Sequence, residues 1–140
     1  ADRRTLTATP VFKVMWIGSE ACLDAYVASD RVLGLAHNAN TVRSHREVFE
    51  FGPRDITKGT GVALLASHLG LAPAQVAGFG DADNDTPLFD WAGFSVAMPQ
   101  ARPEVQARAT AVAPAGPPES AFARGVEQVL AHFAQPASAS

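Results

Sequence analysis

The chain has 140 residues, of which 47% are hydrophobic and 18% charged, which is the length and apolar content of an ordinary globular protein with a buried core. The formal net charge is −3, and Lys and Arg are scattered along the chain, so the sequence has no basic patch of the kind that binds nucleic acid or an anionic membrane. We therefore expect a small soluble ligand, with no nucleic acid and no membrane as partner.

Targeting and redox features are also absent from the sequence. Arg3 and Arg4 are not followed by the apolar run of a signal peptide, and we expect a cytoplasmic protein. The single cysteine, Cys22, cannot form an internal disulfide, and its apolar helical surroundings predict a buried thiol. Residues 59–80 lack charge, but a proline and several glycines favour a helix, a turn and a buried strand over a membrane span.

The first third of the chain predicts a strand, a helix and then further strand. Residues 11–17 are rich in β-branched and aromatic side chains, as in a strand. Ser19 is a suitable N-cap for a helix from Glu20 to about Leu33. Residues 41–51 alternate roughly between apolar and polar, which predicts one or two more strands.

Beyond Pro53 the pattern alternates between helices and strands. Helices are predicted at 58–69, 84–91, 103–109 and 119–133, and strands at 76–79, 94–97 and 110–113. This alternation predicts an α/β fold in which a Rossmann-like parallel sheet has helices on both faces. Residues 135–140 have the composition of a disordered tail.

The segment after the strand at 76–79 carries three carboxylates, those of Asp81, Asp83 and Asp85. Ligands of parallel α/β sheets bind at the carboxyl ends of strands, and a cluster of like charges is most easily kept where a cation neutralises it. Mg²⁺ uses one or two protein carboxylates, several waters and a substrate phosphate, which suits this sparse set of ligands.

Two other interpretations of the acidic segment compete with this one. An EF-hand loop needs Gly where Thr86 stands and Glu where Ala92 stands, so that motif fits poorly. A solvated turn in which Asp83 or Asn84 caps the next helix is the simpler alternative, and the segment by itself leaves it open.

Lys58 stands in the first turn of the helix predicted at 58–69, after a polar turn that begins at Asp55. A cation at that end opposes the helix dipole, which makes sense if the ammonium group and the free amides face one anion such as phosphate. Gly59 and Gly61 would let the backbone approach that anion. An ordinary exposed lysine is the alternative for an isolated residue.

These segments together resemble the C-terminal portion of haloacid dehalogenase (HAD) phosphatases, in particular the Cof-like group with the larger α/β (type IIB) cap. Thr57-Lys58-Gly59 matches the lysine signature of that family, and Gly80 through Asp85 matches its Gly-Asp-x-x-Asn-Asp loop. The resemblance extends over about residues 46–133 and includes 92–98. One departure is Gln100, where relatives often carry Asn, so no role is carried over to it.

The resemblance implies a role for each signature residue. Asp81 and Asp85 are expected to bind Mg²⁺, Asp85 directly or through water. Asn84 is expected to order the phosphate, and Lys58 to neutralise both the phosphate and the nucleophile. Asp83 varies in such loops and is expected only to add charge.

The family's nucleophile has no counterpart in this sequence. Members attack phosphate with an aspartate of an Asp-x-Asp pair near the start of the protein, and the pairings here all lie within Asp81 to Asp85. Residues 11–51 resemble the second part of the cap of this family, which implies that residues 1–52 are the C-terminal part of the cap and residues 53–134 the C-terminal part of the core. Loss of the first core strand would favour dimerisation, strand exchange or poor solubility.

The cap selects the substrate in such enzymes. Polar and aromatic residues of the first third are candidate specificity contacts, although surface or packing roles are commoner for each; they are Trp16, His37, Asn38, Asn40, Arg43, His45 and Arg46. Sugar phosphates are the leading substrate class, followed by other small phosphomonoesters.

Three hypotheses of function follow. The first is a Mg²⁺-dependent phosphatase that works through an aspartyl-phosphate once its N-terminal part is present. The second is a catalytically inactive module for binding metal or phosphate, or for assembly. The third is a structural domain whose acidic loop is only a turn.

Overall fold

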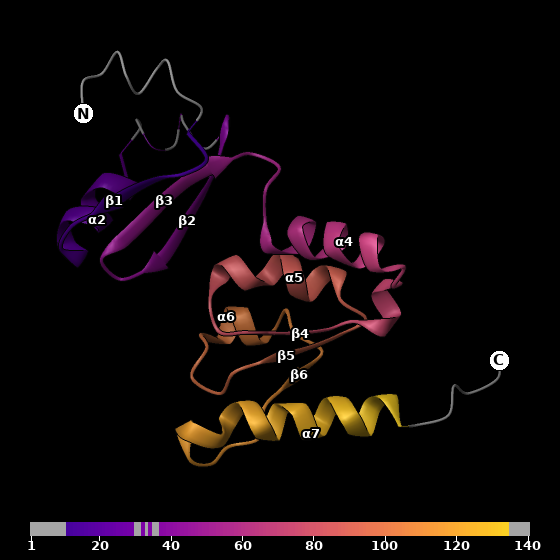
Figure 1. Cartoon of the computed structure of the whole chain (residues 1–140). Helices are drawn as coiled ribbons and strands as arrows, with labels where there is room; N and C mark the ends of the chain where they lie inside the picture. Colours follow the sequence, from indigo (N-terminus) through magenta and orange to yellow (C-terminus); the bar gives the residue numbers. More distant parts are fainter. Residues whose placement is uncertain (1–10, 30–31, 33, 35–36, 135–140) are drawn as a thin grey trace. The chain divides into compact units, whose positions relative to one another are not determined.

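A computed structural model describes residues 11–29, 32, 34 and 37–134 of the chain (Figure 1). The chain divides into two compact units, Ala1–Ile56 and Thr57–Ser140, and each is described by itself. The predicted disordered tail at 135–140 lies outside the described residues. The assignment of the two parts to a cap and a core stays a prediction at this point.

The first unit contains an antiparallel sheet in the order β1-β3-β2. Its strands are Val14–Ile17 (β1), Ala39–His45 (β2) and Val48–Pro53 (β3). Trp16 of β1 pairs with Phe49 of β3, and β2 and β3 form a hairpin with an irregularity between Arg43 and His45. The prediction of one or two strands in 41–51 is confirmed with two, which extend to Ala39 and Pro53, whereas the first strand begins three residues later than expected.

The helix Glu20–Val27 (α2) packs on this sheet. Ser19 caps it as predicted, accepting a hydrogen bond from the backbone N–H of Cys22, but the helix ends at Val27 rather than near Leu33. Leu23 is fully buried against Phe49. The prediction of a buried Cys22 was wrong: the thiol is exposed, because its neighbour Leu23 occupies the core-facing position of the helix.

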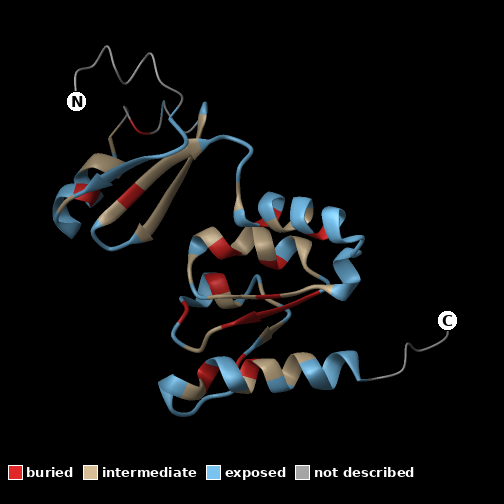
Figure 2. Ribbon diagram, viewed as in Figure 1, coloured by how far each residue is buried: buried red, intermediate tan, exposed pale blue. Residues whose placement is uncertain are grey.

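The second unit contains the predicted parallel sheet, with strand order β4-β5-β6. The strands are Ala77–Gly80 (β4), Phe94–Ala97 (β5) and Ala111–Val112 (β6). Every residue of β5 is buried, as expected for a central strand covered on both faces, and Figure 2 shows it as a red band through this unit.

Four helices surround this sheet: Lys58–Leu69 (α4), Thr86–Trp91 (α5), Pro103–Gln106 (α6) and Ala121–Phe133 (α7). α4 and α5 lie on one side of the sheet and α7 crosses the other (Figure 1). The prediction for α4 is confirmed at both ends, and Gly70 terminates that helix in the left-handed conformation (φ 69°).

The other three helices are shorter than predicted. A 3₁₀ turn, Asp83–Asp85 (η2), precedes α5, and another, Pro118–Ser120 (η3), precedes α7. A third 3₁₀ turn, Pro73–Gln75 (η1), leads into β4. Prolines lie at the first or second position of η1, η3 and α5, where they fix the backbone angle φ. η2 is formed by the acidic loop itself. In the described part of the chain, no helix is long and apolar enough to cross a membrane.

The helices approach their neighbours at glycines. A Cβ atom at Gly59 would lie 2.3 Å from the carbonyl oxygen of Pro87, so α4 can pack this closely on α5 only with glycine there. A Cβ atom at Gly125 of α7 would lie 3.1 Å from the ring of Phe79 on β4. The contact of Gly59 places the N-terminus of α4 beside the start of α5, just after the acidic turn.

We predict that Gly59→Ala lowers the free energy of unfolding by about 1–3 kcal/mol, because the new methyl group meets backbone that cannot move aside easily. Gly61→Ala is the matched control in the same helix: nothing lies within 4 Å of a Cβ there, so we expect no loss and a gain of up to about 1 kcal/mol. Urea denaturation of both variants measures the difference, and equal stabilities would contradict the close packing of α4 on α5.

Candidate functional site

Residues from three segments of the second unit meet near the carboxyl ends of its strands. The turn from Asp81 to Asp85 follows β4, the segment containing Gln100 follows β5, and the N-terminus of α4 lies beside them. In a parallel sheet these strand ends share one edge, which is the usual place for a ligand. All four predicted site residues, Lys58, Asp81, Asn84 and Asp85, belong to this region.

Asp85 is the buried centre of the region, with a residue exposure of 3%. Its Oδ2 accepts hydrogen bonds from the backbone N–H groups of Asp81 (2.8 Å) and Ala82 (3.0 Å), and its Oδ1 forms an ion pair with Lys58 Nζ. A Cβ atom at Gly80 would lie 2.3 Å from this side chain, so the glycine makes room for the carboxylate. Both oxygens of Asp85 therefore have partners within the protein.

Lys58 is held at the start of α4 by a capping box. The backbone N–H of Thr60 donates to Thr57 Oγ1 (3.1 Å), and the backbone N–H of Thr57 donates to Thr60 Oγ1 (2.9 Å). The Lys58 side chain is half exposed, so its ammonium group pairs with Asp85 and still reaches solvent. The sequence predicted a cation at this helix end but not its carboxylate partner.

Asp81 has the exposed carboxylate of this group. Its Oδ2 accepts a long hydrogen bond from Gln100 Nε2 (3.4 Å). Gln100 was left out of the site at the sequence level, because it departs from the pattern of relatives. Gln100 lies just beyond β5, which ends at the same edge of the sheet as β4. That position in the sequence could have predicted its place near Asp81.

Asn84 and Asp83 differ in what they contact. The Asn84 Oδ1 is buried without a hydrogen-bond partner, which is a state that normally indicates an unseen donor or cation. Asp83, by contrast, points to solvent and pairs with Arg102, and its backbone carbonyl accepts from Thr86 Oγ1 (2.9 Å). Asp83 therefore stabilises the turn itself.

The donor set suits one hard cation with few protein ligands. Among the described residues, no group of three or more His, Cys, Asp or Glu side chains is placed to hold a metal ion. Asp81 has an exposed carboxylate with one weak partner and Asn84 has a buried Oδ1 with none, whereas both oxygens of Asp85 are already bonded. Mg²⁺ accepts such a sparse set, because it keeps waters and binds substrate phosphate.

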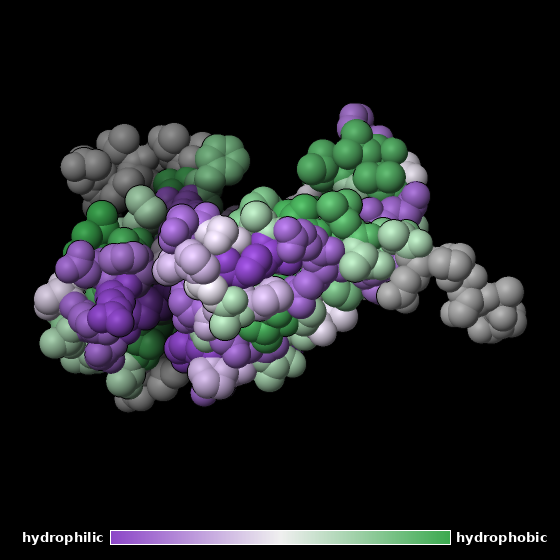
Figure 3. Space-filling model, turned by 90° about the horizontal axis from the view of Figure 1, so that it is seen from below, coloured by the Kyte–Doolittle hydropathy of each residue, from purple (hydrophilic) through white to green (hydrophobic). Residues whose placement is uncertain are grey.

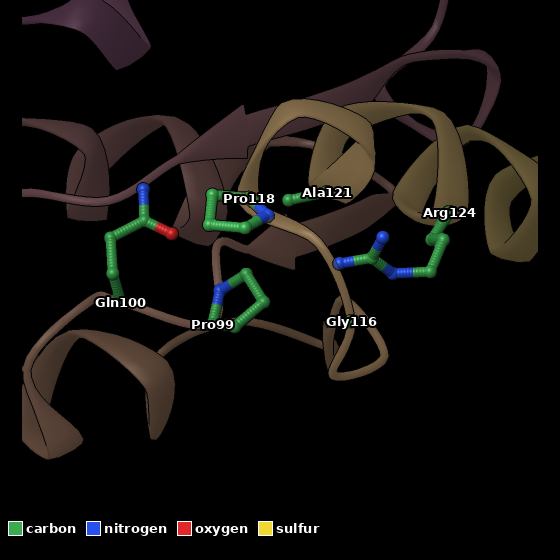
Figure 4. A pocket seen from close by; sticks show the side chains of 6 residues that line it. All are labelled: Pro99, Gln100, Gly116, Pro118, Ala121 and Arg124. Atoms are coloured by element: carbon green, nitrogen blue, oxygen red, sulfur yellow. The ribbon is translucent and has the colours of Figure 1, made fainter.

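A cavity of about 520 Å³ lies beside this region (Figure 4). It is lined by Pro99, Gln100, Gly116, Pro118, Ala121 and Arg124. Arg124 donates to the carbonyl oxygens of Pro114 (2.7 Å) and Pro117 (3.1 Å), so its guanidinium holds the loop before η3. Gln100 connects the cavity with Asp81.

Several candidate specificity residues have structural partners within the first unit. Trp16 contacts Tyr26, with ring centroids 3.7 Å apart, and Arg43 pairs with Asp24. Asn40 Nδ2 donates to the carbonyl oxygen of Ile56 (2.7 Å). His45 Nδ1 accepts from the backbone N–H of Glu47 (3.4 Å). The remaining three, His37, Asn38 and Arg46, are exposed.

Comparison with known families adds an independent finding. The family of haloacid dehalogenase-like hydrolases matches residues 2–120 of this chain. Over 105 residues, which are 74% of this chain and 38% of the relative, it is 30% identical to the HMP-PP phosphatase of Citrobacter koseri. Over 80 residues, 57% of this chain and 34% of the relative, it is 34% identical to the phosphoglycolate phosphatase of Methanothrix thermoacetophila.

Solved structures share the fold. A haloacid dehalogenase-like hydrolase from Bacteroides thetaiotaomicron is 28% identical with a TM-score of 0.67, the match covering 86% of this chain and 44% of that one. The HAD subclass IIB sugar phosphatase BT4131 is 21% identical with a TM-score of 0.68, over 93% of this chain and 46% of that one. The chain thus spans less than half the length of these four relatives.

We predict that Asp85→Ala lowers the free energy of unfolding by about 2–4 kcal/mol, because it leaves two backbone N–H groups and Lys58 without their buried partner. Asp83→Ala is the matched control, since it removes an exposed ion pair and is expected to cost about 0–1 kcal/mol. Urea denaturation compares them. A cost for Asp85→Ala as small as that of the control would show that the buried carboxylate does not hold the loop.

Proposed function

This chain belongs to the haloacid dehalogenase-like hydrolases, and from that premise we propose that its second unit is the metal- and phosphate-binding part of a phosphatase core and its first unit part of a cap. The observation that supports this most strongly is the meeting of Lys58, Asp81, Asn84 and Asp85 at the carboxyl edge of a parallel sheet. The proposed reaction is hydrolysis of a small phosphomonoester.

Asp81 and Asp85 have different roles in this proposal. Asp81 holds Mg²⁺ directly, because its carboxylate is exposed and has only one weak partner. Asp85 acts on the ion through water and keeps the loop in place, because its own oxygens are engaged. When bound, Mg²⁺ would neutralise negative charge on the transferring phosphoryl group.

Lys58 and Asn84 face the phosphate in the same proposal. The ammonium group of Lys58 is half exposed and anchored on Asp85, so it stays positioned to neutralise a phosphate oxygen. Asn84 carries two amide hydrogens that an anion can accept, while its buried Oδ1 lacks a protein partner. Together they would supply positive charge and hydrogen-bond donors to the phosphate.

The nucleophile in this proposal comes from polypeptide outside the 140 residues. A carboxylate oxygen attacks phosphorus, the P–O bond to the substrate alcohol breaks, and the alcohol leaves with a proton from an acid. Water then cleaves the aspartyl-phosphate to release inorganic phosphate. Relatives named for phosphoglycolate, HMP-PP and sugar phosphate support small phosphorylated substrates as the class, with sugar phosphates first.

The second candidate function is a module that binds Mg²⁺ and phosphate without turnover, and the absence of an unassigned Asp-x-Asp pair favours it for the 140 residues alone. We predict that this chain by itself releases no phosphate from p-nitrophenyl phosphate or a sugar-phosphate panel, with Mg²⁺ or with EDTA. Mg²⁺-dependent release that disappears in Asp81→Ala would instead reveal a nucleophile within the chain.

Ligand binding tests the proposed site without requiring turnover. We predict that Mg²⁺ with inorganic phosphate raises the melting temperature of the chain by about 2–5 °C, because the ligands bind only the folded state. Asp81→Ala and Lys58→Met should lose this increase, whereas the control Asp83→Asn should keep it. Differential scanning calorimetry measures the shift, and an unchanged melting temperature in the wild-type chain would favour the interpretation of the acidic loop as a simple turn.

A further inference from the structure

Arg124 lies in the first turn of α7 and lines the cavity described above, with its guanidinium group directed toward the other lining residues (Figure 4). Its Nε donates to the carbonyl oxygen of Pro114 (2.7 Å). Its Nη1 donates to the carbonyl oxygen of Pro117 (3.1 Å) and to Ser120 Oγ (2.6 Å). All three acceptors belong to the segment before α7, so this segment fixes the orientation of the guanidinium before any ligand binds.

The remaining nitrogen of this guanidinium, Nη2 of Arg124, is buried without a hydrogen-bond partner. The ion pairs among the described residues all involve other side chains, so the positive charge of Arg124 has no carboxylate partner there. Buried polar groups are nearly always hydrogen-bonded, and a buried charge is favourable only when it is paired. The atom therefore marks a place where an oxygen from outside the chain can bind.

Gly116 determines how that oxygen can approach. Its φ is 154°, and a Cβ atom there would lie 2.8 Å from Arg124 Cζ, so only glycine lets the loop pass this close to the guanidinium. Since Nε and Nη1 already have acceptors in the loop, an anion cannot use the usual fork of two nitrogens. It meets Arg124 through a single oxygen at Nη2.

The walls of the cavity indicate the rest of the ligand. Pro99, Pro118 and Ala121 are apolar, and Gln100 adds one uncharged amide. The face that carries α7 likewise has apolar and polar residues side by side (Figure 3). The volume of about 520 Å³ is within the range of small-molecule sites. One cation and apolar walls suit a small aliphatic monocarboxylate, whereas a phosphate dianion would bring a second negative charge that no lining residue neutralises.

This cavity is separate from the proposed phosphate contacts. Neither Lys58 nor Asn84 lines it, and its lining residues follow β5 or lie around the start of α7. Gln100 belongs to both places, because it lines the cavity and donates to Asp81 Oδ2 (3.4 Å). A ligand that contacts the Gln100 amide would therefore alter the surroundings of Asp81.

We propose that this cavity is a binding site for a small organic monocarboxylate. One carboxylate oxygen accepts a hydrogen bond from Arg124 Nη2, and the aliphatic part of the ligand lies against the apolar walls. Gln100 links the occupied cavity with the acidic loop. The site needs neither Mg²⁺ nor phosphate, so it goes beyond the proposed phosphatase function and does not rest on it.

The experiment titrates the full 140-residue chain with sodium butyrate at neutral pH and constant ionic strength, with EDTA present. Two-dimensional ¹H–¹⁵N NMR should show saturable shifts of the backbone amides of Gly116 and Ala121 and of the Gln100 side-chain amide. Butanamide has the same shape without the charge, and inorganic phosphate has the additional charge. Each should bind at least about tenfold more weakly than butyrate at these residues.

Two variants test which residues hold the carboxylate. Arg124→Met removes the cation, and Gln100→Glu places a negative charge on the cavity wall while leaving the bonds of Arg124 to the loop in place. Both should weaken butyrate binding at least about tenfold. Arg108→Gln is the matched control, because it removes a cation that pairs with Asp90 and does not line the cavity, and it should bind like the wild type.

Several results would overturn the proposal: no saturable shifts, equal binding of butanamide, tighter binding of phosphate, or shifts confined to residues 58–61 and 81–85. Unchanged binding by Gln100→Glu would overturn it as well, and this variant decides the matter if Arg124→Met disturbs the loop. These measurements involve no Mg²⁺ and no turnover. Failure of the carboxylate site would therefore leave the proposed phosphatase function untouched, and the reverse holds too.

Discussion

The buried carboxylate of Asp85 connects the segments on which the candidate site depends. It pairs with Lys58, which lies 27 positions earlier at the start of α4. It also accepts hydrogen bonds from two backbone amides of the loop after β4. A buried charge is tolerated only when it is paired and hydrogen-bonded, so each of these partners constrains the others. Gly80 and Gly59 belong to the same arrangement, since a Cβ atom at either would collide with a neighbouring segment.

This arrangement explains why three aspartates so close in sequence have different environments. Asp85 is directed inward and bonded, Asp83 outward toward Arg102, and Asp81 lies exposed beside Gln100. A 3₁₀ turn over Asp83–Asp85 rotates successive side chains away from one another, which relieves the repulsion that the sequence alone implies. The weakly bonded carboxylate of Asp81 and the unpaired Oδ1 of Asn84 are the groups that a cation or donor would complete.

β4 connects the proposed chemistry with the core of the second unit. Asp81 follows directly after this strand, which pairs with β5 along its whole length. The ring of Phe79 on β4 contacts Phe122 of α7, so the strand that positions the acidic loop is also held by this helix.

What the sequence by itself determined was local. The apolar run after a polar turn located α4 from Lys58 to Leu69, and β5 was placed correctly at Phe94–Ala97. The alternation of elements predicted a parallel sheet. The spacing of Lys58 before Gly80 through Asp85 was enough to identify the family, because that order of residues reflects shared chemistry.

Only the tertiary structure decided which groups pair. The packing of separate elements decides that Lys58 pairs with Asp85 and that Gln100 reaches Asp81. It also decides that Cys22 faces solvent. The starts of α5 and α7 shifted for the same reason, because prolines and the bonded acidic loop outweighed helix propensity there. Side-chain pairing across elements depends on distances in space, and no pattern along the chain records them.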